Sequence, residues 1–305
     1  MNNFSFYIIN ILKSFIPKFF FQRRLNYWLK EVKKYPEEII NSRVNYYLTL
    51  NSGQLNSNPT TLKDFTRPKK GTMYYYDLLN YTRYFKNHFK INYKFGDIQE
   101  NQDSLSIVKS RPIDHTGNSV IMKLDSLRHY HFINDSIPFS EKKDMIVWRG
   151  YLHKENRRSL VEKFHSHPKC DIGQSNENVE HPTWQKGYLT IENQLQYKFI
   201  LSIEGLDVAT NLKWILSSNS LCFMPTPKFE TWFMEGKLIP NTHYVHIKDD
   251  YSDLEEKMDY YTNNEKEALK LIENAQKWVT QFKDEKLEKI ISLKVLEKYF
   301  KITNQ

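Results

Sequence analysis

The chain has 305 residues, of which 40% are hydrophobic and 15% aromatic, and its formal net charge at pH 7 is +8. This composition excludes wholesale disorder, and the length suits two domains of ordinary size better than one compact core. The basic surplus favours an anionic partner, which could be nucleic acid, phospholipid or a phosphorylated small molecule, and does not choose among them.

The first predicted element is a basic, aromatic segment at residues 1–24. Lys13, Pro17 and Lys18 interrupt its apolar run, which is therefore too short to span a bilayer. No positive charge precedes the run and no small-residue cleavage site follows it, so a signal peptide is not indicated. Two interpretations stay open, an amphipathic segment lying on an anionic membrane and a first helix packed on its own domain.

Helices and a strand are predicted in the rest of the first half. Helical periodicity runs from about 25 to 48 with an interruption at Pro36, and a polar, turn-rich stretch follows over 50–72. The sequence predicts a second helix over 76–89 and a strand over 104–110.

The second half alternates strands with helices. Strands are predicted over 144–150, 197–203, 220–224 and 242–248, and helices over 156–167, 207–218, 265–282 and 286–300. This alternation with short connections indicates an α/β fold with parallel sheets. A change of composition near residue 140 divides the chain into the segment 1–24, a domain over 25–142, a domain over 143–283 and a final helix over 284–305.

Four polar segments stand where predicted strands should end. They are FGD ending at Asp97, KSRP at 109–112, WRG at 148–150 with Arg157 and Arg158, and EGLDVATN at 204–211. In open α/β sheets ligands bind outside the carboxyl ends of strands, so these segments are candidate binding loops. A structural ion pair is the competing interpretation for Arg149.

The fourth segment leads into the predicted helix over 207–218, whose N-terminus would form an anion site. Gly205 is expected to allow a sharp turn, Asp207 or Thr210 to cap the helix, and Asn211 to donate to a phosphate or sugar. An ordinary helix cap without a ligand remains the alternative.

Known nucleotide and metal signatures are missing from the sequence. It contains no GxGxxG, GxxxxGK[ST], GxSxG, HExxH or Asp-x-Asp. Cys170 and Cys222 have no metal or disulfide spacing, and the histidine pairs lack a third ligand, so no metal site is expected.

The ordered motifs resemble glycosyltransferase family 90. The resemblance is carried by WRG with Arg157 seven residues later, EGLDVATNLKWILSSNSLCFM and HYVHIKDDYSDL, while KSRPI, LRH, PFSEKKD and KFETWFMEG are similar to the family's bacterial branch. It covers roughly 90–280, and residues 1–75 add little to it. The resemblance implies a GT-B-like fold, with two Rossmann-like domains facing a cleft, and an inverting, metal-independent transfer from a UDP-sugar without a cofactor.

The resemblance also implies site residues. Asp97 would be the catalytic base, with Glu230 and Glu235 as second candidates. The donor would contact Arg149, Gly150, Tyr151, Arg157, Gly205, Leu206, Asp207, Val208, Ala209, Thr210, Asn211 and Glu230. Lys109, Arg111, Arg128 and His129 would contact the acceptor or the diphosphate. Animal members carry arginine at the position of Asn211 and Phe-Arg-Gly in place of Ile-Glu-Gly, so the diphosphate charge must be met differently here, with Arg128 or Lys109 as candidates.

The bacterial branch implies a glycan acceptor such as lipopolysaccharide core or O-chain. Such an acceptor is assembled at the cytoplasmic face of the inner membrane, which predicts a cytoplasmic protein with a peripheral contact to that membrane and no nucleic-acid partner. Two alternatives stay open. One is a non-catalytic basic module that binds nucleic acid or an anionic membrane, and the other is a transferase with a different phosphorylated or lipid-linked donor. The donor sugar, the linkage and the oligomeric state are not determined by the sequence.

Overall fold

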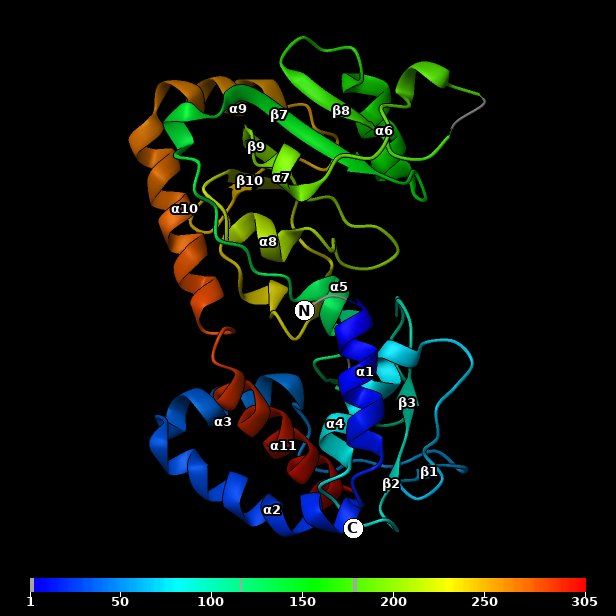
Figure 1. Cartoon of the computed structure of the whole chain (residues 1–305). Coiled ribbons are helices and arrows are strands. Elements are labelled where there is room, and N and C mark those ends of the chain that lie inside the picture. The colour runs from blue at the N-terminus through cyan, green and yellow to red at the C-terminus, as the bar shows by residue number, and fades with distance from the viewer. Residues whose placement is uncertain (1–2, 116, 178–179) are drawn as a thin grey trace. The chain divides into compact units, whose positions relative to one another are not determined.

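The computed structural model describes residues 3–115, 117–177 and 180–305 (Figure 1). The chain forms two compact units. The first contains the chain up to His129 together with Phe229–Phe233 and Phe282–Gln305. The second contains Tyr130–Lys228 and Met234–Gln281. Both contain helices and parallel strands, which confirms the predicted α/β class.

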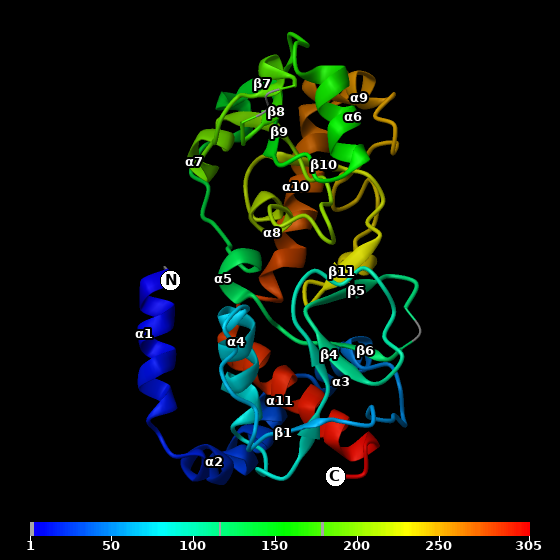
Figure 2. The same cartoon turned by 90° about the vertical axis from the view of Figure 1, so that its right-hand side faces the viewer.

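The first unit contains helices from both ends of the chain. They are α1 (Asn3–Ser14), α2 (Lys18–Glu31), η1 (Val32–Lys34), α3 (Glu37–Tyr47), α4 (Thr72–Thr82), α5 (Ser126–His129) and α11 (Glu285–Ile302). The buried residues of α11 pack against α2, α3 and α4 (Figure 2). Pro36 separates α2 and η1 from α3, as predicted, because proline cannot supply the backbone N–H of a helix interior.

The helix predicted over 76–89 is α4, and it ends earlier than expected. The chain leaves the helix after Thr82, and the rings of Phe85 and Phe89 then pack on Phe300 of α11, with centroids 4.9 and 4.8 Å from it. Local periodicity could not predict the early end of α4, because Phe85 and Phe89 pack on a residue at the far end of the sequence.

The strands of the first unit are short. β3 (Tyr93–Lys94), β4 (Ser106–Val108) and β6 (Ser119–Ile121) form a parallel sheet in the order β3-β4-β6. β5 (Ser110–Pro112) pairs antiparallel with β11 (Phe229–Thr231), and β1 (Thr60–Thr61) with β2 (Lys90–Ile91). The strand predicted over 104–110 therefore corresponds to β4 and the start of β5.

A five-stranded parallel sheet forms the centre of the second unit, in the order β12-β10-β9-β7-β8. Its strands are β7 (Lys143–Gly150), β8 (Cys170–Gln174), β9 (Tyr197–Leu201), β10 (Leu221–Met224) and β12 (Val245–His246). Every residue of β9 and β10 is buried, as expected for parallel strands covered on both faces. The strand predicted over 242–248 is present as β12, which is shorter than predicted and covers only Val245–His246.

The order of this sheet places a topological switch point between β7 and β9. The chain moves from β7 outward to β8, then returns past β7 to β9 and continues outward to β10 and β12. The order corresponds to the doubly wound 2-1-3-4-5 arrangement, in which ligands bind at the carboxyl ends of the first and third strands.

The second unit also contains helices, the longer of which pack against the sheet (Figure 1). They are η2 (Phe139–Glu141), α6 (Glu155–Phe164), η3 (Pro182–Trp184), α7 (Ile191–Gln194), α8 (Leu212–Leu216), η4 (Glu235–Lys237), α9 (Leu254–Asn263) and α10 (Glu265–Thr280). The core includes Trp148, Phe199 and Phe223 from the strands together with Leu160 of α6 and Leu271 of α10.

Candidate functional site

A pocket of about 390 Å³ opens in the second unit at the carboxyl ends of β7 and β9. It therefore coincides with the switch point of the sheet. The predicted WRG and EGLDVATN segments meet here, since Gly150 and Tyr151 end one strand and Ile203, Thr210 and Asn211 follow the other. The remaining lining residues are Trp148, Arg149, Arg157, Ser175, Tyr188, Leu189, Ile191, Gln194 and Trp214.

Arg157, in the first turn of α6, places a cation at this pocket. Its Nη2 and Nε donate to the carbonyl oxygens of Ile203 and Glu204 at 2.8 and 3.0 Å, and its Nη1 donates to that of Tyr151 at 3.2 Å. No carboxylate among the described residues forms an ion pair with this guanidinium. Burial lowers the pKa of Arg157, but a guanidinium stays protonated in a protein. A partly buried guanidinium that bonds to neutral carbonyls keeps its full positive charge, which is the chemistry that an anionic ligand requires.

Gly205 and Gly150 allow close packing around Arg157. A Cβ atom at Gly205 would lie 3.0 Å from Nη2 of Arg157, and one at Gly150 would lie 2.6 Å from Cζ2 of Trp148. Neither glycine has the left-handed backbone that only glycine adopts easily. The chain does bend directly after Gly205, whose N–H donates to the carbonyl oxygen of Asp207 at 3.0 Å, but this bend needs no left-handed glycine. What requires a glycine at this position is the close approach of the Arg157 guanidinium to the backbone.

The helix predicted over 207–218 is also wrong in its first turn. α8 covers only Leu212–Leu216, and neither Asp207 nor Thr210 caps it. Asn211 Nδ2 instead donates to the carbonyl oxygen of Leu201 at 2.9 Å, which ties the loop to the end of β9. A five-residue helix has a small dipole, so the positive charge of this pocket comes from Arg157 rather than from a helix N-terminus.

Only part of the predicted donor segment reaches the pocket. Thr210 and Asn211 line it, whereas Asp207, Val208 and Ala209 are buried and Leu206 is exposed outside the lining.

Arg149 lines the same pocket but already has a partner. Its Nη2 lies 2.7 Å from Oδ1 of Asp171, and Tyr197 donates to the other oxygen at 2.6 Å. Burial raises the pKa of Asp171, but these hydrogen bonds and the arginine charge outweigh it and hold that pKa below its usual value. The structural ion pair considered for Arg149 is thus confirmed.

Two tyrosines present exposed rings at the pocket. Tyr151 is 51% exposed and Tyr188 is 79% exposed. Exposed aromatic rings beside a polar pocket offer faces on which a nucleobase or a sugar can stack. Tyr151 was predicted from the sequence, whereas Tyr188 was missed because it lies in an irregular loop between β8 and β9 without a periodic signal.

Asp97 lies in the first unit, after β3, with two cations. Its Oδ1 is 2.5 Å from Nζ of the fully buried Lys109 and 3.1 Å from Nη2 of Arg128. Burial raises the pKa of Asp97, but the hydrogen bond and charge of Lys109, with those of Arg128, bring it below its usual value. The carboxylate is therefore ionised at neutral pH.

Arg128 links Asp97 to a second pocket, of about 570 Å³, in the first unit. Asn3, Tyr7, Thr72, Tyr74, Asp125 and Leu127 are among its other lining residues. His129 is fully buried behind it, 3.8 Å from Asp125. The structure thus gathers Asp97, Lys109 and Arg128 in one place.

Arg111 and Glu230 occupy a different place in the first unit. They face each other across β5 and β11, with Nε 2.8 Å from Oε1, and Tyr46 donates to the other carboxylate oxygen. Their side chains are 0% and 2% exposed. Glu235, in the second unit, is buried in an ion pair with Lys213 at 2.5 Å. None of these carboxylates or cations lines the pocket at the switch point.

No group of three His, Cys, Asp or Glu side chains within residues 3–115, 117–177 and 180–305 could hold a metal ion.

Comparisons with known proteins identify relatives of the chain. Residues 118–304 match the family described as Glycosyl transferase family 90. The chain is 38% identical over 309 residues to the O-glucosyltransferase LpsA of Dichelobacter nodosus, covering 98% of this chain and 95% of that protein. It is 22% identical over 179 residues to the O-glucosyltransferase rumi of Drosophila pseudoobscura pseudoobscura, covering 55% and 43% of the two chains. The family match includes every residue that lines the pocket at the switch point.

Proposed function

The chain belongs to Glycosyl transferase family 90 and is a glycosyltransferase, and on that premise we propose that it moves a sugar from a UDP-sugar to a glycan hydroxyl. The proposed reaction inverts the anomeric carbon and needs no metal ion. The observation that carries this proposal is the guanidinium of Arg157, which lies in the pocket at the switch point without a carboxylate partner among the described residues. The relatives' names favour glucose as the sugar.

In the proposed donor complex the diphosphate lies against Arg157. Tyr151 and Tyr188 offer ring faces to the uracil or the sugar. Thr210 and Asn211 offer hydrogen bonds to the hydroxyls of the sugar. In a GT-B-like arrangement the second unit would thus bind the donor, while the first unit would supply the acceptor side. We propose a surface glycan such as lipopolysaccharide core or O-chain as the acceptor.

The chemical step follows from these assignments. The acceptor hydroxyl attacks the anomeric carbon from the face opposite UDP and passes its proton to Asp97. The bond from the anomeric carbon to the phosphate oxygen breaks, and its electron pair leaves on UDP. Arg157 stabilises the charge that develops there, which is the task a metal ion performs in other transferases.

We expect Arg157→Ala to weaken UDP binding by about 3 kcal/mol, a hundredfold or more, because the diphosphate loses a partly buried, hydrogen-bonded cation. Isothermal titration calorimetry with and without EDTA measures this directly. Arg158→Ala is the matched control, since the neighbouring Arg158 lines a different pocket and should leave UDP affinity unchanged. Equal affinity for the wild type and Arg157→Ala would overturn the donor assignment.

Two other outcomes of the same titration are also decisive. UDP binding that EDTA removes would contradict metal independence. A wild-type chain that binds no UDP in either condition would contradict the UDP-sugar donor and would favour a transferase with a different phosphorylated or lipid-linked donor.

We expect Gly205→Ala to weaken UDP binding by roughly tenfold, because the new methyl group displaces the Arg157 guanidinium and disturbs its hydrogen bonds. The double variant Gly205→Ala/Arg157→Ala should bind no more weakly than Arg157→Ala alone, since both changes act on the same group. Fully additive losses in calorimetry would show that Gly205 acts independently of Arg157.

A further inference from the structure

Helix α1 and the beginning of α2 expose an unusual amount of apolar surface. Phe4, Leu12 and Phe15 are 74%, 61% and 78% exposed. Of the seventeen large apolar side chains that are exposed in the described part of the chain, nine lie between residues 4 and 20. A patch of this kind on a folded surface marks a site of interaction with a protein or a membrane.

The opposite face of α1 is packed on its own unit. Phe6 is 2% exposed and lies edge-on to Tyr76 of α4, and Asn80 of α4 donates to Oδ1 of Asn10 at 2.9 Å. The hydroxyls of Tyr7 and Thr72 are 2.9 Å apart. The interpretation of a first helix packed on its own domain is therefore confirmed for one face of α1, and the other face remains available to a partner.

The charged side chains within the segment that carries this apolar face are all positive. Residues 1–30 contain five lysines and arginines and no aspartate or glutamate. Of these cations, Lys13, Arg23, Arg24 and Lys30 are exposed. A second copy of the same face would bring like charges together, whereas an anionic lipid surface accepts the apolar side chains and pairs with the cations.

The two helices meet at a sharp bend. No single helix of the described chain is long and apolar enough to cross a membrane, and Asn3–Ser14 with Lys18–Lys34 passes that test only as a pair bent by 102°. Because the contacts with α4 hold one side of α1, that helix can present only its other side to a bilayer. Figure 2 shows α1 at the margin of the first unit.

We propose that α1 and the first two turns of α2 dock the protein on the surface of an anionic bilayer. Phe4, Leu12 and Phe15 enter the boundary between headgroups and acyl chains, and Arg23 and Arg24 pair with the anionic headgroups.

The docking surface also predicts how the acceptor reaches the enzyme, and this prediction rests on the proposed function. Asn3 and Tyr7 of α1 line the pocket that contains Arg128, the partner of Asp97. The helix that lies on the bilayer is therefore also a wall of the pocket beside the proposed base. An acceptor glycan anchored in the same bilayer would reach this pocket without leaving the membrane.

Vesicle flotation of the full chain tests the docking surface. We expect binding to vesicles of equimolar phosphatidylcholine and phosphatidylglycerol and none to phosphatidylcholine alone. The variant Phe4→Gln/Leu12→Gln/Phe15→Gln should lose at least about tenfold in affinity, since three inserted side chains become polar. The variant Arg23→Gln/Arg24→Gln should lose roughly tenfold to thirtyfold, and high salt should weaken wild-type binding similarly.

The matched control is Ile239→Gln/Tyr260→Gln/Leu269→Gln, three exposed apolar side chains of the second unit, which should bind vesicles like the wild type. Circular dichroism and UDP calorimetry should show that the N-terminal triple variant is folded and retains its donor affinity, which separates this proposal from the proposed function. Vesicle binding equal to the wild type in that variant would overturn the proposal. A wild type that ignores vesicles but forms a dimer, dissociated by the same variant in sedimentation, would assign the face to self-association and overturn it as well.

Discussion

Asp97→Asn is expected to slow sugar transfer by about two to four orders of magnitude, the usual range for removal of a general base. The amide has nearly the volume of the carboxylate and can still accept a hydrogen bond from Lys109, so the local fold should persist. UDP affinity should be unchanged, because Asp97 does not line the pocket that contains Arg157. Transfer to a glycan acceptor under donor saturation, with calorimetry of UDP alongside, separates the two effects.

The pH dependence of the wild type follows from the charges around Asp97. Burial raises the pKa of Asp97, but Lys109 and Arg128 hold it below the usual value for an aspartate, which is about 3.9. The loss of transfer rate caused by protonation of Asp97 should therefore occur only below that pH. The transfer rate should therefore show no ionisation of Asp97 between about pH 5 and pH 8. The same depressed pKa stabilises the fold above the unfolded-state pKa, and that contribution is lost as the pH falls through the folded-state pKa.

Glu100→Gln is the control for Asp97→Asn. Glu100 is close in sequence, and its side chain is 61% exposed in a surface pair with Lys94, so its loss should not change the rate. Near-normal turnover of Asp97→Asn would mean that the base is another residue. Glu230 and Glu235 are poor successors, because both are buried in ion pairs with Arg111 and Lys213.

The sequence predicted the elements that depend on local patterns. The apolar runs of β7, β9 and β10 and the periodicity of α10 and α11 are strong enough to be recognised without tertiary contacts. The pocket at the switch point was also partly predictable, because WRG and EGLDVATN both follow strands and the carboxyl ends of parallel strands share one edge.

The features that could not be predicted depend on contacts between distant residues. The first turn of the expected helix over 207–218 is a loop because Asn211 bonds to Leu201, and Gly205 is small because Arg157 approaches it. Glu230 was assigned to the donor, but it pairs with Arg111 across two strands that are far apart in sequence. No local pattern contains these partners.

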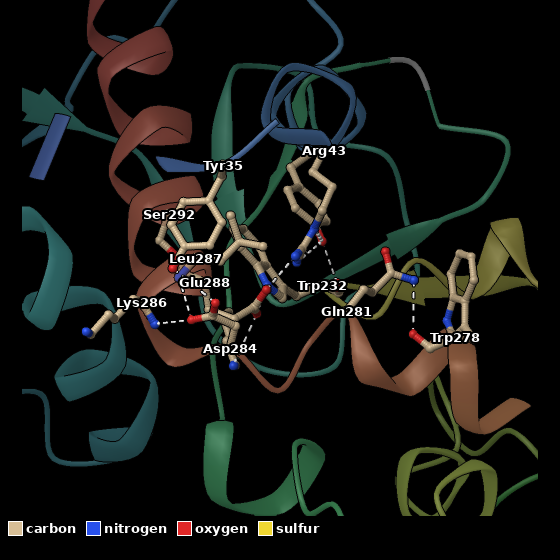
Figure 3. Close-up of polar contacts among 12 residues, drawn as sticks. Tyr35, Arg43, Trp232, Trp278, Gln281, Asp284, Lys286, Leu287, Glu288 and Ser292 are labelled. Carbon is tan, nitrogen blue, oxygen red and sulfur yellow. Dashed lines mark hydrogen bonds and ion pairs between the residues drawn. The ribbon is translucent and has the colours of Figure 1, made fainter. Parts of the chain in front are cut away.

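Glu288→Ala is expected to lower the free energy of unfolding of the first unit by about 3–5 kcal/mol, the cost of leaving a buried ion without its partner. Glu288 of α11 joins three distant segments of the chain, and Figure 3 shows two of its partners, Arg43 and Trp232. One carboxylate oxygen lies 2.5 Å from Nη1 of Arg43, while the other accepts from Nε1 of Trp232 at 2.6 Å and lies 3.2 Å from Nζ of Lys123. Arg43 is 3% exposed, so water cannot replace the lost carboxylate.

Chemical denaturation of Glu288→Ala and Glu297→Ala measures this difference within one helix. Glu297 forms a half-buried pair with Lys294, three residues away, and because water still reaches both side chains its loss should cost less than about 1 kcal/mol. The double variant Arg43→Met/Glu288→Met should recover much of the loss, because replacing both members of a buried pair by apolar side chains removes the unpaired charge. Similar destabilisation by the two single alanine variants would show that the Arg43–Glu288 pair does not hold α11 in the first unit. The expected difference would instead show that this buried pair stabilises the attachment of the C-terminal helix to a unit that begins more than two hundred residues earlier in the chain.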